Sequence, residues 1–235
     1  MSVSRTHWTS AALFAVLAAT ACSGATRAGT GAGEAVRPEE RPAAEIEALY
    51  RARKDSALTR FNEADVRFMT GMISHHAQAL VMAGFAATHG ASPAVQTLAA
   101  RIINAQKDEI ATMQRWLRDR GQPVPEVHIE GANVMVHGAG GGMDMSMQMP
   151  GMLTPEQMRQ LEQAHGAEFD RLFLTFMIQH HRGAVTMVHD LFRTDGAGQG
   201  DLTFKLASDI QADQTTEIAR MKLMLSALPA EGRAP

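Results

Sequence analysis

The sequence of 235 residues has one cysteine and few aromatic residues. A single cysteine excludes an intrachain disulfide framework, an iron–sulfur cluster and a thiolate zinc site held by one chain. Aromatic residues make up 5% of the chain, with one Tyr and two Trp, which is little material for a β-sandwich or a base-stacking surface. The formal net charge of −3 also argues against nucleic acid as a partner, because such proteins carry a basic patch.

The first 22 residues predict export. Arg5 supplies a short positive region, and residues 8–21 form a mostly apolar stretch with the length of a signal sequence. Small residues precede Cys22, as in bacterial lipoprotein signals, in which the cysteine becomes the lipidated first residue. We therefore expect a periplasmic or cell-envelope protein with a lipid anchor at Cys22, and ordinary cleavage near Ala21 is the alternative. No later apolar run is long enough to span a bilayer.

Composition divides the rest of the chain. Residues 23–44 are rich in Gly, Ala, Thr, Glu, Arg and Pro without an apolar period, and they predict a flexible tether. Residues 45–228 are expected to form a single domain, and residues 229–235 a tail. Within the domain, two repeats at about 62–121 and 154–228 are joined by a methionine-rich linker, residues 122–153.

The main organisational feature is an internal duplication. The segment Asp65–Met82 recurs 105 residues later as Asp170–Met187, and both contain Met-Ile-x-His-His followed by Met. A second pair, Gln106–Met113 and Gln214–Met221, repeats at an offset of 108 residues. The larger offset implies three extra residues in the second copy, and residues 194–200 are their expected place.

Each copy predicts two helices, since capping residues stand before helical patterns and glycines or prolines follow them. In the first copy, helices are expected at about 62–88 and 92–120. In the second copy, one helix is expected from Thr154 through Gly166 to about Arg193, and another from a cap at Asp201 to before Pro229. A shorter helix is expected at about 45–58, before both copies. A single hairpin cannot bury the apolar faces of both of its helices, whereas two packed hairpins can. The predicted fold class is therefore all-α, a four-helix bundle built from two tandem helical hairpins.

The face predicted to be buried contains polar groups. At about 100° per residue, the repeated residues of the first helix share one face. They are Asp65, Phe68, Met72, His75, His76, Ala79 and Met82. Buried polar groups are costly unless they are paired. One interpretation is structural: the histidine pairs would hydrogen-bond Gln106, Glu109, Gln214 and Glu217 and only set the register of the helices.

The other interpretation is metal binding. Met72 precedes His75 and His76 by three and four residues, so the three side chains can converge on one point. Neutral imidazole and thioether groups form a soft donor set that suits Cu(I), with Ag(I) as its mimic. The glutamates and glutamines of the partner helices would then orient the imidazole N–H groups.

The linker carries a second group of methionines after a run of glycines. Met143, Met145, Met147 and Met149 alternate with other residues, and Met152 follows. We expect a flexible capture site for Cu(I) or Ag(I), to which His128 and His137 could add ligands. The alternatives are low-complexity filler and a loop that docks its methionines on the helices.

At these residues the chain resembles domain of unknown function 305, a family that includes the periplasmic copper-binding CopM-like proteins. The shared pattern spans about residues 62–228 and occurs twice in order. The resemblance implies a ferritin-like four-helix bundle, an exported location and, in characterised members, copper binding with a part in copper tolerance. Carried over by position, the candidate ligands are Met72, His75, His76, Met82, Met177, His180, His181 and Met187. The methionine-rich linker lies outside the shared pattern, and Gly183 stands where the first copy has Gln78.

Three functions follow from these observations. The first is a non-catalytic protein that sequesters Cu(I) or passes it to a partner protein in the cell envelope. The second is a structural or interaction lipoprotein with a satisfied histidine core. The third is a ferritin-like di-iron carboxylate protein, for which Glu162 and His165 form the only Glu-x-x-His motif near the predicted bundle. No nucleophile elbow or acid pair predicts an enzyme.

Overall fold

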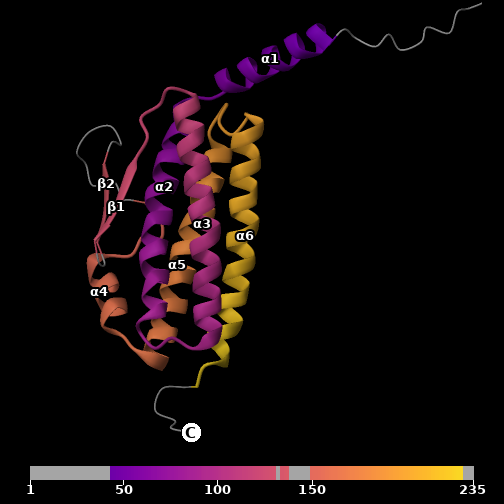
Figure 1. Ribbon diagram of the computed structural model, residues 1–235. Coiled ribbons are helices and arrows are strands. Elements are labelled where there is room, and N and C mark those ends of the chain that lie inside the picture. Colours follow the sequence, from indigo (N-terminus) through magenta and orange to yellow (C-terminus); the bar gives the residue numbers. More distant parts are fainter. Residues whose placement is uncertain (1–42, 131–132, 138–148, 230–235) are drawn as a thin grey trace, which may run out of the picture. The chain divides into compact units, whose positions relative to one another are not determined.

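The structure is a computed structural model that describes residues 43–130, 133–137 and 149–229 (Figure 1). The described residues belong to one compact unit. Its elements are α1 (Ala43–Thr59), α2 (Glu63–Gly84), the 3-10 helix η1 (Phe85–Ala87), α3 (Pro93–Asp119), β1 (Glu126–Glu130), β2 (Asn133–His137), α4 (Pro155–Gln163), α5 (Gly166–Arg193) and α6 (Asp201–Ala227). The predicted signal, Cys22, the tether, and Met143, Met145 and Met147 lie outside the described residues.

The helices begin at the predicted capping residues, with one exception. The Asn62 side chain accepts hydrogen bonds from N–H groups in the first turn of α2, and the Asp65 carboxylate accepts one from the Asn62 N–H. Thr154 starts α4 with a capping box in the same way. Asp201, predicted as the cap of the last helix, is instead its first residue, and Gly200 occupies the cap position without a side-chain bond.

The prediction of one helix through Gly166 is wrong. The chain leaves the helical conformation at Ala164 and His165, and Gly166 has φ +60°, a left-handed conformation that favours glycine. The Gly166 N–H donates to the carbonyl of His89 at 2.8 Å, so a contact with the first repeat holds the break in place. Glu162 and His165 therefore do not share a helix.

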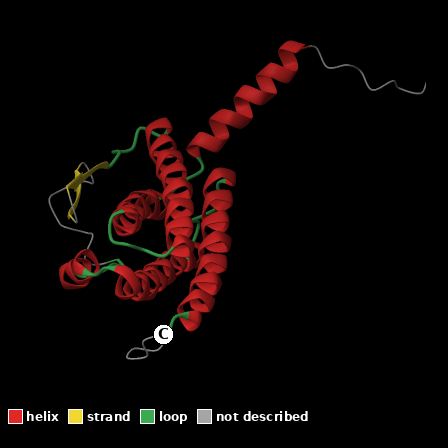
Figure 2. Cartoon of the chain, turned by 60° about the horizontal axis from the view of Figure 1, so that its bottom comes forward, coloured by secondary structure: helices red, strands yellow, loops and turns green. Residues whose placement is uncertain are grey.

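The four longest helices, α2, α3, α5 and α6, form the packed part of the unit (Figures 1 and 2). The closest contacts join α2 to α3 and α5 to α6, and the two hairpins meet mainly through α2 and α5. Helix α4 packs on α5, and an antiparallel hairpin of β1 and β2, which the sequence did not predict, packs on α2. The all-α prediction is confirmed, with α1, α4 and this small hairpin added to the four long helices. Among the described residues, no helix is long and apolar enough to cross a membrane.

The repeated aspartates tie each hairpin to the other. Asp65, at the start of α2, accepts the N–H of Gly198 in the α5–α6 loop at 2.7 Å. Asp170, at the start of α5, accepts the N–H of Ser92 in the loop before α3 at 3.1 Å. Both carboxylates are buried, and charge-assisted bonds of this kind are stronger than neutral ones. This reciprocal pair fixes α2 and α5 as antiparallel neighbours.

Two separate apolar clusters make up the core. One contains Met72, Met69 and Met113, and we name it the Met72 cluster. The other contains Met82, Met177 and Met221, and we name it the Met82 cluster. Buried polar side chains of α2 and α5 lie at the middle of these helices, where the two clusters would otherwise join. The candidate site is this polar layer.

Candidate metal centre

Four fully buried histidines form a layer at the middle of α2 and α5. They are His75 and His76 on α2 and His180 and His181 on α5, and we call them the histidine layer. The rings of His75 and His180 meet across the α2–α5 interface with centroids 3.8 Å apart. Because the two helices are antiparallel, the duplicated motifs face each other around this contact.

Each ring in the layer makes one hydrogen bond through Nε2. His76 pairs with Glu109 of α3 and His181 with Glu217 of α6, both at 2.7 Å. His75 donates to the carbonyl of Pro150 at 3.0 Å, and His180 donates to the backbone carbonyl of His75 at 2.9 Å. A carbonyl only accepts, so Nε2 carries the proton in both of these last rings.

The second nitrogen, Nδ1, is buried and has no partner in any of the four rings. In a neutral ring that is protonated at Nε2, Nδ1 holds a lone pair and can act as a metal ligand. Four such atoms in one layer are unusual, because most buried polar side-chain atoms have a partner. The layer therefore offers the donor chemistry that a soft metal ion requires.

Burial keeps His75, His180 and His181 neutral. It lowers the pKa of His75 to about 3, with the neighbouring His76 adding to the effect and the Pro150 carbonyl opposing it. Burial also lowers the pKa of His180 well below 6.5, with the neighbouring rings contributing. The pKa of His181 is lowered by burial too, although its hydrogen bond to the Glu217 carboxylate opposes the shift. Neutral imidazole is the form that binds metal.

The candidate methionines flank the histidine layer on both sides. Met72 belongs to the Met72 cluster, against which the partly buried Met187 packs. Met82 and Met177 belong to the Met82 cluster. Each side of the layer thus receives one methionine from each repeat. The sequence predicted the methionine ligands of each repeat on one face of a single helix. In the structure they form two pairs, and each pair has one methionine from α2 and one from α5.

The end of the linker covers the histidine layer. The side chain of Gln78 donates to the carbonyl of Leu153 at 3.1 Å and accepts its N–H at 2.7 Å. On α5, a Cβ added to Gly183 would come within 1.9 Å of the Pro150 carbonyl oxygen, so only glycine allows the linker this close. Gln78 and Gly183 occupy equivalent positions in the two repeats. Gln78 binds the end of the linker, and Gly183 leaves the space that the linker occupies.

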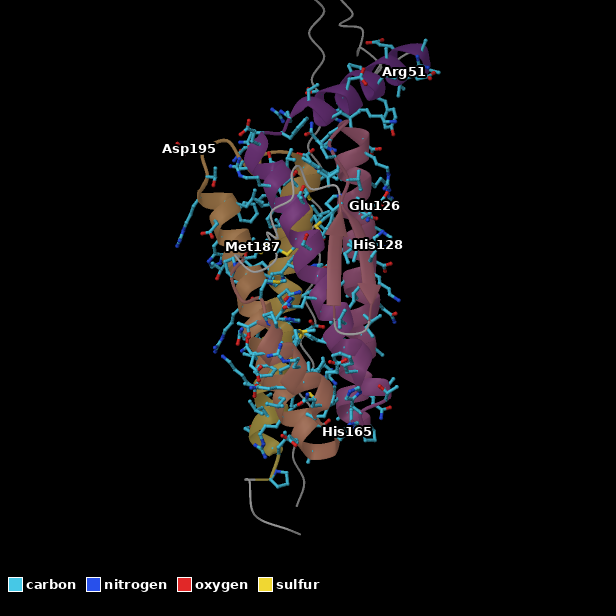
Figure 3. The ribbon with its side chains drawn as sticks, turned by 90° about the vertical axis from the view of Figure 1, so that its left-hand side faces the viewer. Arg51, Glu126, His128, His165, Met187 and Asp195 are labelled. Atoms are coloured by element: carbon cyan, nitrogen blue, oxygen red, sulfur yellow. The ribbon has the colours of Figure 1, made fainter. Side chains whose placement is uncertain are left out.

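One linker methionine reaches the helices. Met149 Sδ and Met187 Cε each lie 3.3 Å from the place that a Cβ of Gly71 would occupy. The last methionine of the alternating run therefore packs beside a candidate ligand of α5, whose position is labelled in Figure 3. Met143, Met145 and Met147 precede it outside the described residues.

The glutamines and glutamates named in the sequence line a cleft between α3 and α6. Its volume is about 430 Å³, and its walls include Gln106, Glu109, Gln214 and Glu217 together with Asp213. Burial raises the pKa of Asp213, and the charges of Glu109 and Glu217 add to the shift. The structural interpretation expected Gln106 and Gln214 to hydrogen-bond the histidines. Instead, both polar atoms of Gln106 and the Oε1 of Gln214 are buried without a partner.

Other candidates lie elsewhere. His128 is exposed on β1, 3.9 Å from Glu126 (Figure 3). The rings of His89 and His165 stack with centroids 4.9 Å apart at the N-terminal end of α5, and the His89 ring donates a hydrogen bond to the Glu162 carbonyl. Among the described residues, no three Asp, Glu, His or Cys side chains converge closely enough to hold a metal ion on their own.

Sequence reasoning missed the Pro150 carbonyl and its seating by Gln78 and Gly183. Backbone acceptors leave no trace in residue identity, so the carbonyl itself could not be found. The departure of the second repeat from the first at Gly183 was the available signal, since glycine at a helical position often marks a close backbone approach.

The model of the family described as Domain of unknown function (DUF305) matches residues 65–225. Among solved structures, a DUF305 fragment from Deinococcus radiodurans is 27% identical, with a TM-score of 0.58, covering 72% of this chain and 99% of that one. A DUF305 protein from Streptomyces coelicolor, described as a candidate secreted protein, is 26% identical, with a TM-score of 0.58 and coverage of 73% and 98%.

CopM in its Cu(II)-bound form is 30% identical to this chain, with a TM-score of 0.52, and the match covers 69% of this chain and 95% of CopM. The Cu(I)-bound and Ag-bound forms of CopM are also similar to this chain. No curated protein matches the chain.

Proposed function

Because the chain belongs to the DUF305 family, we propose that it is an exported, non-catalytic copper-binding protein that sequesters Cu(I) or passes it on. The bound forms of the similar protein CopM support copper and silver as the metals. The observation that carries the proposal within this chain is the set of four unpartnered Nδ1 atoms in the histidine layer.

The proposed ligands are the Nδ1 atoms of the histidine layer and the sulfurs of Met72, Met82, Met177 and Met187. Since no three imidazole or carboxylate groups converge in the described part of the chain, thioethers have to complete the coordination. A set of few imidazoles with methionine favours Cu(I) over Zn(II), Mg(II) or Ca(II). Glu109 and Glu217 would orient the rings of His76 and His181 through Nε2, as carboxylates do for metal-binding histidines elsewhere.

The linker has a role in the same proposal. We place Met143, Met145, Met147 and Met149 in a capture segment that delivers the ion to the helices. The packing of Met149 beside Met187 supports this role, because Met149 ends the segment and Met187 is a proposed ligand. Lipidation at Cys22 and a copper-transfer partner protein remain part of the proposal.

A specific observation weakens each alternative. A histidine core with a structural role alone would satisfy both ring nitrogens, whereas here only Nε2 is bonded in all four rings. A di-iron carboxylate centre needs several carboxylates and histidines around the metal, and among the described residues no three such side chains lie close enough to hold an ion. In its one Glu-x-x-His motif, Glu162 lies in α4 and His165 lies in the break before α5.

The test is a competition titration with Cu(I), Ag(I), Zn(II) and Fe(II) on the chain without its first 22 residues. The double variant H75A/H180A should lose tight Cu(I) and Ag(I) binding. The matched control is H89A/H165A, which removes another stacked histidine pair outside the layer and should bind like the unmodified chain. Equal losses in both variants, or no preference for the monovalent metals, would overturn the proposal.

A second variant guards against misfolding of the first. M82L/M177L keeps the volume of the Met82 cluster nearly constant, since Leu replaces Met with little cost in a core. Circular dichroism should show an unchanged helix content. Cu(I) affinity should still fall, because two thioethers are replaced by hydrocarbon.

A further inference from the structure

The cleft between α3 and α6 has a polar wall without partners. Gln106 is 2% exposed, and neither its Oε1 nor its Nε2 has a hydrogen-bond partner. Gln214, its equivalent in the second repeat, is 3% exposed, and its Oε1 also lacks a partner. Both side chains line the cleft. Buried carboxamides are costly when unbonded, so these groups are suited to bind water molecules or a hydrated solute in the cleft.

The charge of the cleft favours a cation. Glu109, Asp213 and Glu217 contribute three carboxylates, against the two guanidinium groups of Arg101 and Arg220. In the part of the chain that the structure describes, neither arginine lies within 4.0 Å of a carboxylate oxygen as an ion pair. Because acidic side chains outnumber basic ones in this lining, the cleft carries a net negative charge that attracts cations.

The other large cleft near the histidine layer has the opposite character. It measures about 650 Å³ and lies beside Pro150, between α5 and α6. Arg182 and Lys222 line it, and no acidic side chain does. A cation is therefore repelled at this cleft and attracted at the cleft between α3 and α6.

The acidic cleft leads directly to the histidine layer. The side chains of Glu109 and Glu217 remain 14% and 23% exposed, while each holds a fully buried ring, His76 or His181, at 2.7 Å. The same two carboxylates thus line the cleft and contact the imidazoles. The backbones of α3 and α6 approach each other closely at few positions, which leaves room for the cleft between them.

We propose that the cleft between α3 and α6 is the port through which a hydrated metal cation reaches the histidine layer. Asp213 at the mouth attracts the ion, and Gln106 and Gln214 hold its water shell before it passes between Glu109 and Glu217. This inference rests on the proposed function, because it names the route to the same site.

The experiment measures the rate of Ag(I) association by stopped flow. Trp116 is the only tryptophan after residue 22, and it lies in the Met72 cluster, so its fluorescence reports binding. Chloride-free nitrate buffers keep Ag(I) in solution. The variants are D213N and D213K, and the controls are D190N and D190K, which change the same charge at an exposed position of α5.

At low ionic strength, D213N should lower the association rate about two- to threefold and D213K about fivefold, the effect of one or two charges several ångströms from the path in water. The D190 controls should leave the rate unchanged. In about 1 M salt the differences should vanish, because the Debye length falls to about 3 Å.

Three outcomes are distinct. Slower association in the D213 variants alone supports the port. Rapid Ag(I) binding with equal rates in the D213 and D190 variants overturns the port and leaves the proposed function intact. Absence of Ag(I) binding in every protein overturns the proposed function and the port together.

Discussion

Acid should destabilise the metal-free protein through the histidine layer. Burial lowers the pKa of His75 to about 3 and that of His180 well below 6.5. Between these lowered values and the ordinary pKa of 6.5, the unfolded chain binds a proton at each ring and the folded chain does not. The unfolded state therefore holds more protons, so the free energy of unfolding rises with pH in this window and falls as the solution is acidified.

The size of the effect follows from the same shifts. Lowering the pH from about 7.5 to about 5.5 stabilises the unfolded state by about 1.4 kcal/mol for each ring that stays neutral when folded. His75 and His180 together should thus cost the fold about 2.8 kcal/mol. His181, whose pKa is also lowered, adds to this loss.

Urea unfolding followed by circular dichroism at the two pH values, with a chelator present, measures this loss. The matched variant H75Q/H180Q replaces both rings with side chains that do not titrate. Its stability should depend less on pH than that of the unmodified chain, by about 2.8 kcal/mol over the same interval. Identical pH dependence in the two proteins would refute the claim that burial holds these rings neutral.

Three further predictions concern single positions. Gly183→Ala should cost about 1–3 kcal/mol of stability, since its Cβ would collide with the linker carbonyl, whereas Gly84→Ala, with no atom within 4 Å, should be neutral or stabilise by up to about 1 kcal/mol. Equal effects in urea unfolding would contradict the seating of the linker. Asp170→Ala should cost about 1.5–3 kcal/mol by removing a buried acceptor, and an unchanged unfolding midpoint would show that the clamp between hairpins contributes nothing. Glu217→Gln should weaken Ag(I) binding about tenfold in competition titration, and unaltered affinity would deny the glutamate its orienting role.

Local patterns in the sequence predicted most of the helical framework. Caps such as Asn62 and Thr154 act within one turn, so residue identity is enough to place them. The break at Gly166 was missed because the apolar pattern continues through it, and a bond to His89, far away in the sequence, holds the turn. The β1–β2 hairpin was also missed, since its packing on α2 is a tertiary contact.

The candidate site was predictable in composition but not in arrangement. The helical period put Met72, His75 and His76 on one buried face, and all three are fully buried. How the methionines divide into two pairs depends on the antiparallel packing of α2 against α5. That packing is fixed by contacts between hairpins, such as the bond from Gly198 to Asp65, which a single helix does not encode.

The most direct test of the account is ¹⁵N NMR of the four imidazoles in the histidine layer. In the metal-free chain, the rings should show protonated Nε2 and unprotonated Nδ1, as their hydrogen bonds require. On addition of Ag(I), resonances of Nδ1 in this layer should shift and those of Nε2 should stay protonated. Unchanged Nδ1 resonances in a silver-loaded protein, or coordination through Nε2, would contradict the central claim.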